Sequence, residues 1–268
     1  HGKTHTAVLR AAGLRAAGRA TGLLGTVLTR IGDDQVPSVR TTPEATDLHA
    51  LFAVMRERGV DAVAMEVSSH ALAFGRVDGV RFACSAFTNL TQDHLDFHAD
   101  MEHYYAAKAG LFTPARSDCG VVNTDDPYGE RLLADATIPL QSYGEQGTWR
   151  AVDVELRPDG SSFRLLGPGV DVAAAVRLPG AFNVSNAVAA LAMLVTVGVS
   201  VEDAVRGVAA LSGVPGRMER VDVGQPFTAI VDYAHTPAAM QTLRAAVREG
   251  TAGRAIIVPG CVGDAGRA

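Results

Sequence analysis

Residues 61–70 read DAVAMEVSSH, an apolar run that ends in the carboxylate of Glu66. A near-continuous apolar run is typical of a strand buried on both faces of a parallel sheet. Ligands of open α/β sheets bind beyond the carboxyl ends of such strands, which is where Glu66 would lie. The run therefore predicts an α/β fold with Glu66 at a binding site. A surface carboxylate at a strand end is the alternative, and the adjoining Ser68, Ser69 and His70 favour the binding site.

A second apolar run, Phe82–Leu90, leads into the segment TQDHLDFH at positions 91–98 and then to Lys108. The chain has 24 Lys and Arg residues, of which only Lys3 and Lys108 are lysine. A lysine can meet a phosphate as a point charge, or lose its proton and react, and arginine cannot replace it in the second role. The scarcity of lysine therefore suggests functional roles for both residues. A solvated helix lysine is the alternative for Lys108.

Two metal interpretations are open for the histidines of this segment. The i,i+4 spacing of His94 and His98 would suit a zinc pair, but no cysteine lies near them. Carboxylates such as Asp93 and Asp96 suit magnesium better, because Mg²⁺ prefers oxygen ligands. A lone histidine is most often structural, so His94 is a candidate ligand only through its neighbours.

The chain start carries part of a phosphate-binding motif. Gly2–Lys3–Thr4 matches the tail of the loop G-x-x-x-x-G-K-[ST], in which backbone N–H groups and a helix N-terminus hold phosphates. Residues 4–20 are rich in Ala, Leu and Arg and predict the helix that such a loop needs. The triplet alone is weak, and the chain, which begins with His1 inside this motif, is interpreted as a fragment of a longer protein.

Thr41–Thr42–Pro43–Glu44 predicts a helix start, with Thr42 as the N-cap and Pro43 at the first helical position. The helix is expected to end at Arg58, before Gly59. Capping alone explains this threonine pair. A strand is expected within residues 21–32, flanked by turns.

Composition excludes several classes of function. The 268-residue chain has a net charge of −5 and no basic run, so no nucleic-acid partner is expected. The sequence has no run of about 18 apolar residues, so no membrane span is expected, and no signal peptide is visible. Three scattered cysteines are too few for a disulfide framework, which favours a reducing cytoplasm.

The second half of the chain has a different pattern of apolar and polar residues. Alternating segments between residues 151 and 178 predict an antiparallel meander. Asn183 and Asn186 open an apolar helix, where they could act as caps or touch a ligand on one face. Residues 212–216, SGVPG, are the strongest linker candidate. Beyond them a second α/β domain is expected to begin, with strands at 218–223, 227–233 and 253–259 and a helix at 237–249.

Taken together, these motifs resemble the Mur ligase family, and within it the type that adds the third amino acid to the peptidoglycan peptide (the MurE type). No single motif is specific, but their order is, and the resemblance covers essentially the whole chain. The motifs are GKT at 2–4, TTPE at 41–44, MEVSSH at 65–70, NLTQDHLDFH at 89–98, Lys108, Asn183 with Asn186, PGRMER at 215–220 and DYAHTP at 232–237.

The resemblance implies two domains. Residues 1–214 would be the central ATPase domain, a P-loop-type, mostly parallel sheet flanked by helices with a small antiparallel meander. Part of its phosphate loop is missing. Residues 215–268 would begin the C-terminal domain, a truncated Rossmann-like α/β unit.

The resemblance also implies a reaction. The family forms an amide between a diamino acid and UDP-N-acetylmuramoyl-L-alanyl-D-glutamate through an acyl phosphate made from ATP, with Mg²⁺ at two sites. The resemblance leaves meso-diaminopimelate and L-lysine open as the added residue. A cytoplasmic monomer is expected, and the chain as it stands is expected not to ligate because the domain that binds the diamino acid is incomplete.

Site residues carry over from the family by position. The catalytic set is Lys3, Glu66, His94 and Lys108. The magnesium ligands are Thr4, Glu66, His94 and Lys108, the last as a carbamate. The ATP contacts are Gly2, Lys3, Thr4, Asn183, Asn186, Arg217, Asp232 and His235. The contacts to the muramoyl peptide are Thr41, Thr42, Ser68 and Arg76.

Two rival functions remain at this point. A folylpolyglutamate synthase-like ligase belongs to the same superfamily, and the MEVSSH and TTP motifs argue against it. A non-catalytic nucleotide-binding fragment or degenerate homologue is the other. The chain also departs from the family pattern, with His5 at a position where the family has threonine and Phe74 where some members have glutamine.

Overall fold

The computed structural model describes residues 2–91, 97–234, 237–249, 251 and 253–259. Its first parallel strand pair leads directly to the predicted binding-site residue Glu66. Strand β1 (Thr21–Leu24) pairs in parallel with β4 (Ala62–Met65), in register from Thr21 opposite Ala62 to Leu24 opposite Met65. Every residue of β1 is buried, as expected for a strand covered on both faces.

The segment from Thr21 to Val36 forms three strands, and not the single strand expected within residues 21–32. Two further strands, β2 (Thr29–Ile31) and β3 (Asp34–Val36), extend the sheet in the order β3-β2-β1-β4 by antiparallel pairing. Gly25 therefore lies in the turn between β1 and β2 and Gly32 in the turn between β2 and β3, while Gly22 lies within β1.

A second parallel sheet supplies the other strands of the predicted α/β core. Strands β5 (Ser85–Phe87), β6 (Gly120–Asn123) and β7 (Leu140–Tyr143) run parallel in that order. In the described part of the chain, β4 and β5 share no ladder. A cleft of about 840 Å³ is lined by residues of β4, by residues 79–84, which precede β5, and by Arg10.

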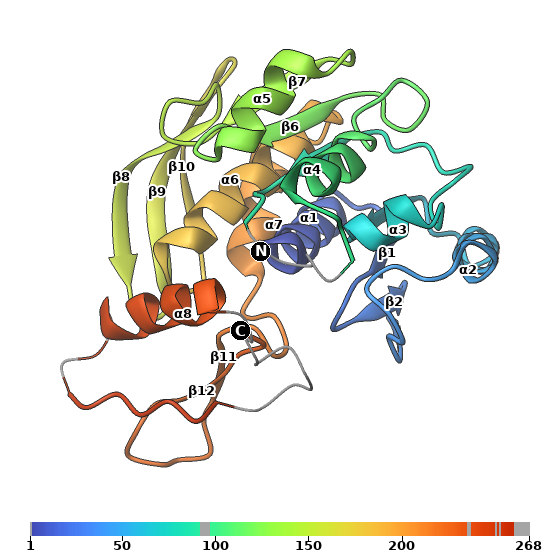
Figure 1. Cartoon of the computed structure of the whole chain (residues 1–268). Helices are drawn as coiled ribbons and strands as arrows, with labels where there is room; N and C mark the ends of the chain where they lie inside the picture. The colour runs from blue at the N-terminus through green and yellow to red at the C-terminus, as the bar shows by residue number, and fades with distance from the viewer. Residues whose placement is uncertain (1, 92–96, 235–236, 250, 252, 260–268) are drawn as a thin grey trace.

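Helices cover both sheets (Figure 1). Helix α1 (Lys3–Ala16) packs against α6 (Ala181–Thr196), α7 (Val201–Ala210), β1 and β4. Beyond Asn186, helix α6 is almost wholly apolar, and every residue from Ala187 to Leu194 is buried, which is typical of a helix at the centre of a domain. The remaining helices of this region are α2 (Ala45–Glu57), α3 (Ser69–Ala73), α4 (Met101–Ala109) and α5 (Pro127–Asp135).

The predicted meander is confirmed. Strands β8 (Arg150–Arg157), β9 (Gly160–Gly167) and β10 (Val170–Val176) form an antiparallel sheet in the order β10-β9-β8. The sheet packs on α6 and α7 (Figure 1). The fold class expected from the sequence, mixed α/β with parallel strands and a small antiparallel sheet, is therefore correct.

The last segment is only partly as expected. Strands β11 (Glu219–Val221) and β12 (Ala229–Val231) pair with each other, and α8 (Pro237–Glu249) follows. The strand expected at 253–259 is wrong, since these residues form no ladder and Ile256 and Val258 are largely exposed. An apolar run becomes a strand only when a neighbouring strand pairs with it, and none of the described residues does so here. No helix in the described ranges is long and apolar enough to cross a membrane.

Candidate functional site

The carboxylate predicted at the strand end lies where the sequence put it. Glu66 directly follows β4, and its backbone N–H donates to the Leu24 carbonyl at 2.8 Å, which extends the ladder to β1 by one step. Because the two strands end at the same edge, the loops that follow them meet there. Glu66 is 3% exposed, so its carboxylate is buried between these loops.

Three hydrogen bonds converge on this buried carboxylate. The Thr4 hydroxyl donates to Oε2 at 3.0 Å, and Thr26 donates from its backbone N–H to Oε1 at 2.8 Å and from its hydroxyl to Oε2 at 3.2 Å. A buried charge needs such compensation. At Gly25 a Cβ atom would overlap Oε1, so only glycine lets the loop after β1 approach so closely.

The oxygen atoms of Thr4 and Glu66 suit a hard cation. Thr4 contributes a hydroxyl and Glu66 a carboxylate, which are the ligand types that Mg²⁺ prefers. Their side chains already touch, so the two residues could share one ion. Among the residues that the structure describes, no three His, Cys, Asp or Glu side chains cluster in a way that could hold a metal by themselves.

The start of α1 is held by the two asparagines of α6. Gly2 caps α1 with φ of 81°, a left-handed conformation that favours glycine, and a Cβ here would also overlap the Asn186 side chain. Asn186 donates to Asn183 at 3.1 Å, and Asn183 donates to the Pro179 carbonyl at 2.8 Å. Both asparagines are buried, and Asn186 lies close to Gly2 of the GKT segment.

Arg217 reaches the same point from the linker that follows α7. Its Nη2 donates to the Thr4 hydroxyl at 3.3 Å, and its guanidinium lies 4.7 Å from the centre of the Tyr233 ring. Both carboxylate oxygens of Asp232 accept backbone N–H groups, from Met218 and Ala234, each at 2.8 Å. Met218 has a positive φ of 48°, an uncommon conformation that the Asp232 bond holds in place.

The first turn of α1 is also electrostatically unusual. Burial, reinforced by the positive charge of Arg217, lowers the pKa of His5 to about 4, although Asp232 acts in the opposite direction. Its imidazole is therefore neutral near pH 7.

Thr42, one of the residues predicted to contact the peptide, bonds the backbone of Glu66 and does not cap a helix. The Thr42 hydroxyl donates to the Glu66 carbonyl at 2.9 Å and accepts the Ser68 N–H at 3.2 Å. Thr41 shares a hydroxyl contact with Thr26 at 3.0 Å. The prediction that Thr42 caps a helix is wrong, because α2 begins at Ala45 and this buried hydroxyl has closer partners across the site.

Two further residues of the predicted peptide set have local partners. Ser68 caps α3 and accepts the Ala71 N–H at 3.1 Å. Arg76 is largely buried and holds Glu44 through two nitrogens, at 3.1 and 2.9 Å. Ser68 lies in the short loop between β4 and α3, whereas Arg76 follows α3.

Lys108 belongs to a different set of contacts. Its Nζ lies 5.0 Å from the centre of the Tyr104 ring. The His98 ring stacks on the same Tyr104 ring, with the two ring centres 4.7 Å apart. His98 Nε2 is 3.0 Å from the Ser69 hydroxyl. The i,i+4 zinc pair that His98 could have formed is thus not needed to explain its position, and its predicted partner His94 lies outside the described residues, as does His235.

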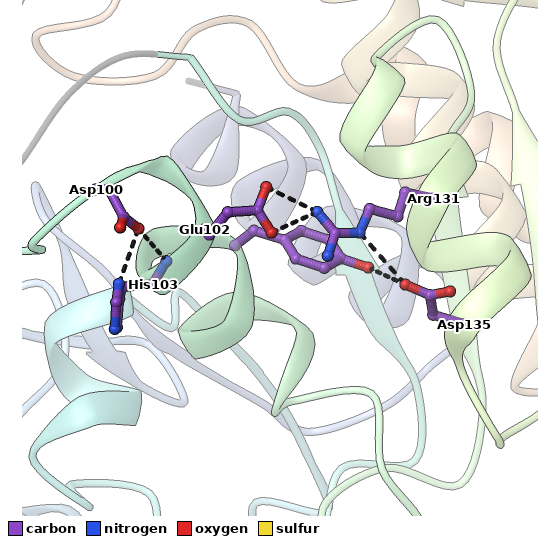
Figure 2. A network of polar contacts seen from close by, with 6 residues as sticks. Asp100, Glu102, His103, Arg131 and Asp135 are labelled. Carbon is purple, nitrogen blue, oxygen red and sulfur yellow. Dashed lines mark hydrogen bonds and ion pairs between the residues drawn. The ribbon is translucent and has the colours of Figure 1, made fainter.

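Helix α4, which carries Lys108, is fastened to α5 by a polar network (Figure 2). Arg131 donates to both Glu102 oxygens, at 2.9 and 2.7 Å, and pairs with Asp135 at 3.4 Å. Tyr105 donates to Asp135 at 3.2 Å, and burial, reinforced by the negative charge of Asp135, raises the pKa of Tyr105 to about 12. At the start of α4, Asp100 caps the helix by accepting the His103 N–H at 2.8 Å.

Thr26 is the site residue that sequence reasoning missed. Its contacts with Glu66 join positions 40 residues apart. The available signal was the Gly25–Thr26 pair directly after a buried strand, at the edge where Glu66 was expected.

The architecture and the GKT-to-Glu66 contact define an α/β protein of the phosphate-loop type. The model of the Mur ligase middle domain matches residues 1–194, and that of the Mur ligase glutamate ligase domain matches residues 216–268. The chain belongs to the Mur ligase family.

Named relatives and solved structures agree with this assignment. The chain is 55% identical over 271 residues to the UDP-N-acetylmuramoyl-L-alanyl-D-glutamate--2,6-diaminopimelate ligase of Streptomyces avermitilis, covering 99% of this chain and 53% of that protein. A solved structure of a ligase with the same name is 27% identical, with a TM-score of 0.79 over 93% of this chain and 52% of that one. The folylpolyglutamate synthetase of Lactobacillus casei, 17% identical with a TM-score of 0.69, covers 92% of this chain and 69% of its own and shares the fold alone. The chain spans about half the length of the curated relatives it matches.

Proposed function

We propose that this chain is the ATP-binding part of an amide ligase that adds a diamino acid to UDP-N-acetylmuramoyl-L-alanyl-D-glutamate in peptidoglycan synthesis. The observation that carries the proposal is the contact between Thr4 of the GKT segment and the buried carboxylate of Glu66. It joins a helix start suited to phosphate with oxygen ligands suited to magnesium. The names of the relatives favour 2,6-diaminopimelate over lysine as the added residue.

The reaction would run in two steps. A carboxylate oxygen of the dipeptide attacks the γ-phosphorus of ATP, ADP leaves, and an acyl phosphate forms. The amine of the diamino acid then attacks the acyl carbon, phosphate departs with its bridging oxygen, and the amine loses a proton to give the amide. The protein's contribution is to align the reactants and to neutralise charge.

Specific roles follow from position. Lys3 would contact the outer phosphates, while Thr4 and Glu66 would hold one Mg²⁺. His94 would help to hold a second ion. Bound Mg²⁺ would neutralise the charge of the phosphates.

The remaining ATP contacts would come from both ends of the chain. Gly2, Asn183 and Asn186 lie together at the start of α1, and Arg217 reaches Thr4 from the linker. Asp232 supports the Arg217 loop, and His235 completes the set. The domain boundary between residues 214 and 215 stays a prediction, and the second unit would contribute Arg217 to the nucleotide site.

Lys108 would act as a carbamate. A neutral lysine amine can add CO₂ and become an anion, which could support magnesium where arginine could not. Thr41, Thr42, Ser68 and Arg76 would form the muramoyl-peptide side, with the buried Thr42 supporting the loop. A monomer in the cytoplasm stays a prediction.

The proposal is tested with the protein expressed from its complete gene. Incubation with ATP, Mg²⁺, the UDP-muramoyl dipeptide and 2,6-diaminopimelate should release phosphate and give a tripeptide product of the expected mass. Omission of any one component should stop product formation. Product from a folate and glutamate instead would support the folylpolyglutamate rival, and nucleotide binding without phosphate release would support the non-catalytic one.

A further inference from the structure

Cys84 and Cys119 lie opposite each other where two neighbouring parallel strands begin. The β5–β6 ladder starts at the residues that directly follow the two cysteines, and a parallel bridge joins Phe82 to Ser117 a short way before them. The paired residues have the same offset along the chain on both sides of the cysteines. The register is therefore continuous, and it sets Cys84 opposite Cys119.

The geometry of this pair suits a disulfide. Neighbouring strands lie about 4.8 Å apart, and opposite residues point to the same face of the sheet. A disulfide needs Cα atoms about 4.4 to 6.8 Å apart. The two thiols are already close enough to share a hydrogen bond. A bond between the sulfur atoms therefore requires a rotation of the side chains and no shift of the strands.

The two thiols differ in environment. Cys84 is 2% exposed, whereas Cys119 is only partly buried and its Sγ donates to the Ala83 carbonyl at 3.1 Å. The hydrogen bond from Cys84 lowers the pKa of Cys119 to about 7, against the effect of burial. The same bond, together with burial, raises the pKa of Cys84. Near pH 7, Cys119 is therefore partly thiolate while Cys84 keeps its proton.

A guanidinium from α1 lies beside the pair. Arg10 donates from Nη1 to the Cys84 carbonyl at 3.3 Å, and its Nε has no partner in the part of the chain that the structure describes. Its positive charge favours the thiolate of Cys119, whereas Asp118 acts in the opposite direction. Asp118 already accepts a hydrogen bond from Arg81 at 2.6 Å. A partly exposed thiol near a positive charge is the environment typical of a reactive cysteine.

We propose that Cys84 and Cys119 form a reversible oxidation site, at which a hydroperoxide converts the two thiols into one disulfide. The Cys119 thiolate attacks the hydroxyl oxygen of the hydroperoxide, the O–O bond breaks, and the departing alkoxide takes a proton to become an alcohol. The Cys84 sulfur then attacks the sulfenic acid of Cys119, and hydroxide leaves with the Cys84 proton as water. The sulfur pair loses two electrons and the peroxide gains them.

A low-molecular-weight thiol would return the pair to its reduced state by exchange. Few cysteines and no disulfide framework are compatible with such a site, because disulfides of reducing compartments are usually transient. The pair precedes β5 and β6, whereas Glu66 follows β4, so the site shares no residue with the proposed nucleotide site. The proposal goes beyond the proposed function and does not depend on it.

Peptide mass spectrometry on the protein from the complete gene tests the pair. Trypsin releases the two cysteines in separate peptides, 82–108 and 117–131. Brief treatment with hydrogen peroxide near pH 7 should join these peptides with the loss of two hydrogen atoms, and dithiothreitol should separate them again. Cys261→Ser is the matched control and should give the joined peptide at the wild-type level. Absence of the joined peptide from treated wild type would overturn the proposal.

Single variants test the order of the two steps. Cys84→Ser should stop at the sulfenic acid of Cys119, which dimedone labels, whereas Cys119→Ser should leave Cys84 unlabelled. Label on Cys84 in the second variant and none on Cys119 in the first would overturn the assigned roles.

A readout on the wild-type protein does not depend on the variants folding. Alkylation of Cys119 by iodoacetamide, followed in peptide 117–131, should rise with pH around a midpoint of about 7. The urea-unfolded protein should show the midpoint of an ordinary thiol, about 8.5. Equal midpoints in the folded and unfolded protein would overturn the proposal.

Discussion

The two sides of the proposed magnesium site are built in different ways. Around Glu66, hydrogen bonds of 2.8 to 3.2 Å from Thr4 and Thr26 converge on one carboxylate that is 3% exposed. Around Lys108, the contacts include two rings: Lys108 Nζ lies over the Tyr104 ring, and the His98 ring stacks on the same ring.

The difference has a chemical meaning. A carboxylate fixed by several donors is preorganised. A contact between an amine and a ring face is weaker than several hydrogen bonds to a buried carboxylate. Substitution of Glu66 should therefore abolish function, whereas an added carboxylate should be able to take the place of the Lys108 carbamate.

Glu66→Gln should have the largest effect. The amide nitrogen of glutamine would face the donors that now bind the carboxylate, and the metal would lose a charged ligand. We expect ligation to fall on the order of 1,000-fold, the upper range for the loss of one electrostatic contact. The free energy of unfolding should fall by about 2 kcal/mol, because hydrogen bonds to a buried charge are lost. Phosphate release and urea denaturation measure the two effects.

Glu57→Gln is the matched control for this change, since Glu57 lies at the exposed end of α2. It should alter neither quantity. A Glu66→Gln protein that ligates normally would contradict both the metal role of Glu66 and the contrast between the two sides.

Lys108→Ala should have the next largest effect and separates two explanations of this lysine. If Lys108 acts as a carbamate, ligation should fall on the order of 100-fold or more, and a short-chain carboxylic acid should restore part of it. Lys108→Arg would keep a cation over the Tyr104 ring but could not carry the carbamate, so it should be as inactive as the alanine variant. Full activity in either variant would refute the modification, and activity in the arginine variant alone would assign Lys108 a cation–π role.

How much of this site the sequence could predict depends on how local each signal is. The strand that ends at Glu66 and the buried helix that begins near Asn183 follow from apolar patterns within one element. The neighbours of Glu66 do not. The partners Thr4 and Thr26 are 62 and 40 residues away in the chain, and their approach depends on the pairing of β1 with β4.

The errors have the same origin. Thr42 has the residue type of an N-cap, but its hydroxyl bonds a carbonyl 24 residues away, because the loop crosses the end of β4. Residues 253–259 have the composition of a strand and lack a partner among the described residues. A local pattern states what a segment can form, and the tertiary neighbours decide whether it does.

Tyr105→Phe should have the smallest effect and tests whether the support of α4 is separate from the chemistry of Lys108. The change removes the hydroxyl that donates to Asp135 and keeps the buried ring, which packs against Tyr128 at 5.5 Å. One lost hydrogen bond should lower the free energy of unfolding by about 1 kcal/mol. Ligation should stay within about twofold of wild type, because the network in Figure 2 joins α4 to α5 through Glu102, Arg131 and Asp135 as well.

Tyr128→Phe is the control, since it preserves the same ring pair without touching Asp135 in any described contact. Urea denaturation and phosphate release on both variants give the comparison. If Tyr105→Phe lost activity as severely as Lys108→Ala, the single hydrogen bond from Tyr105 on α4 to Asp135 on α5 would be setting the position of Lys108. In that case the ring contact with Tyr104 could not be what orients the lysine, and the Lys108 side would depend on hydrogen-bond geometry as strictly as the Glu66 side does.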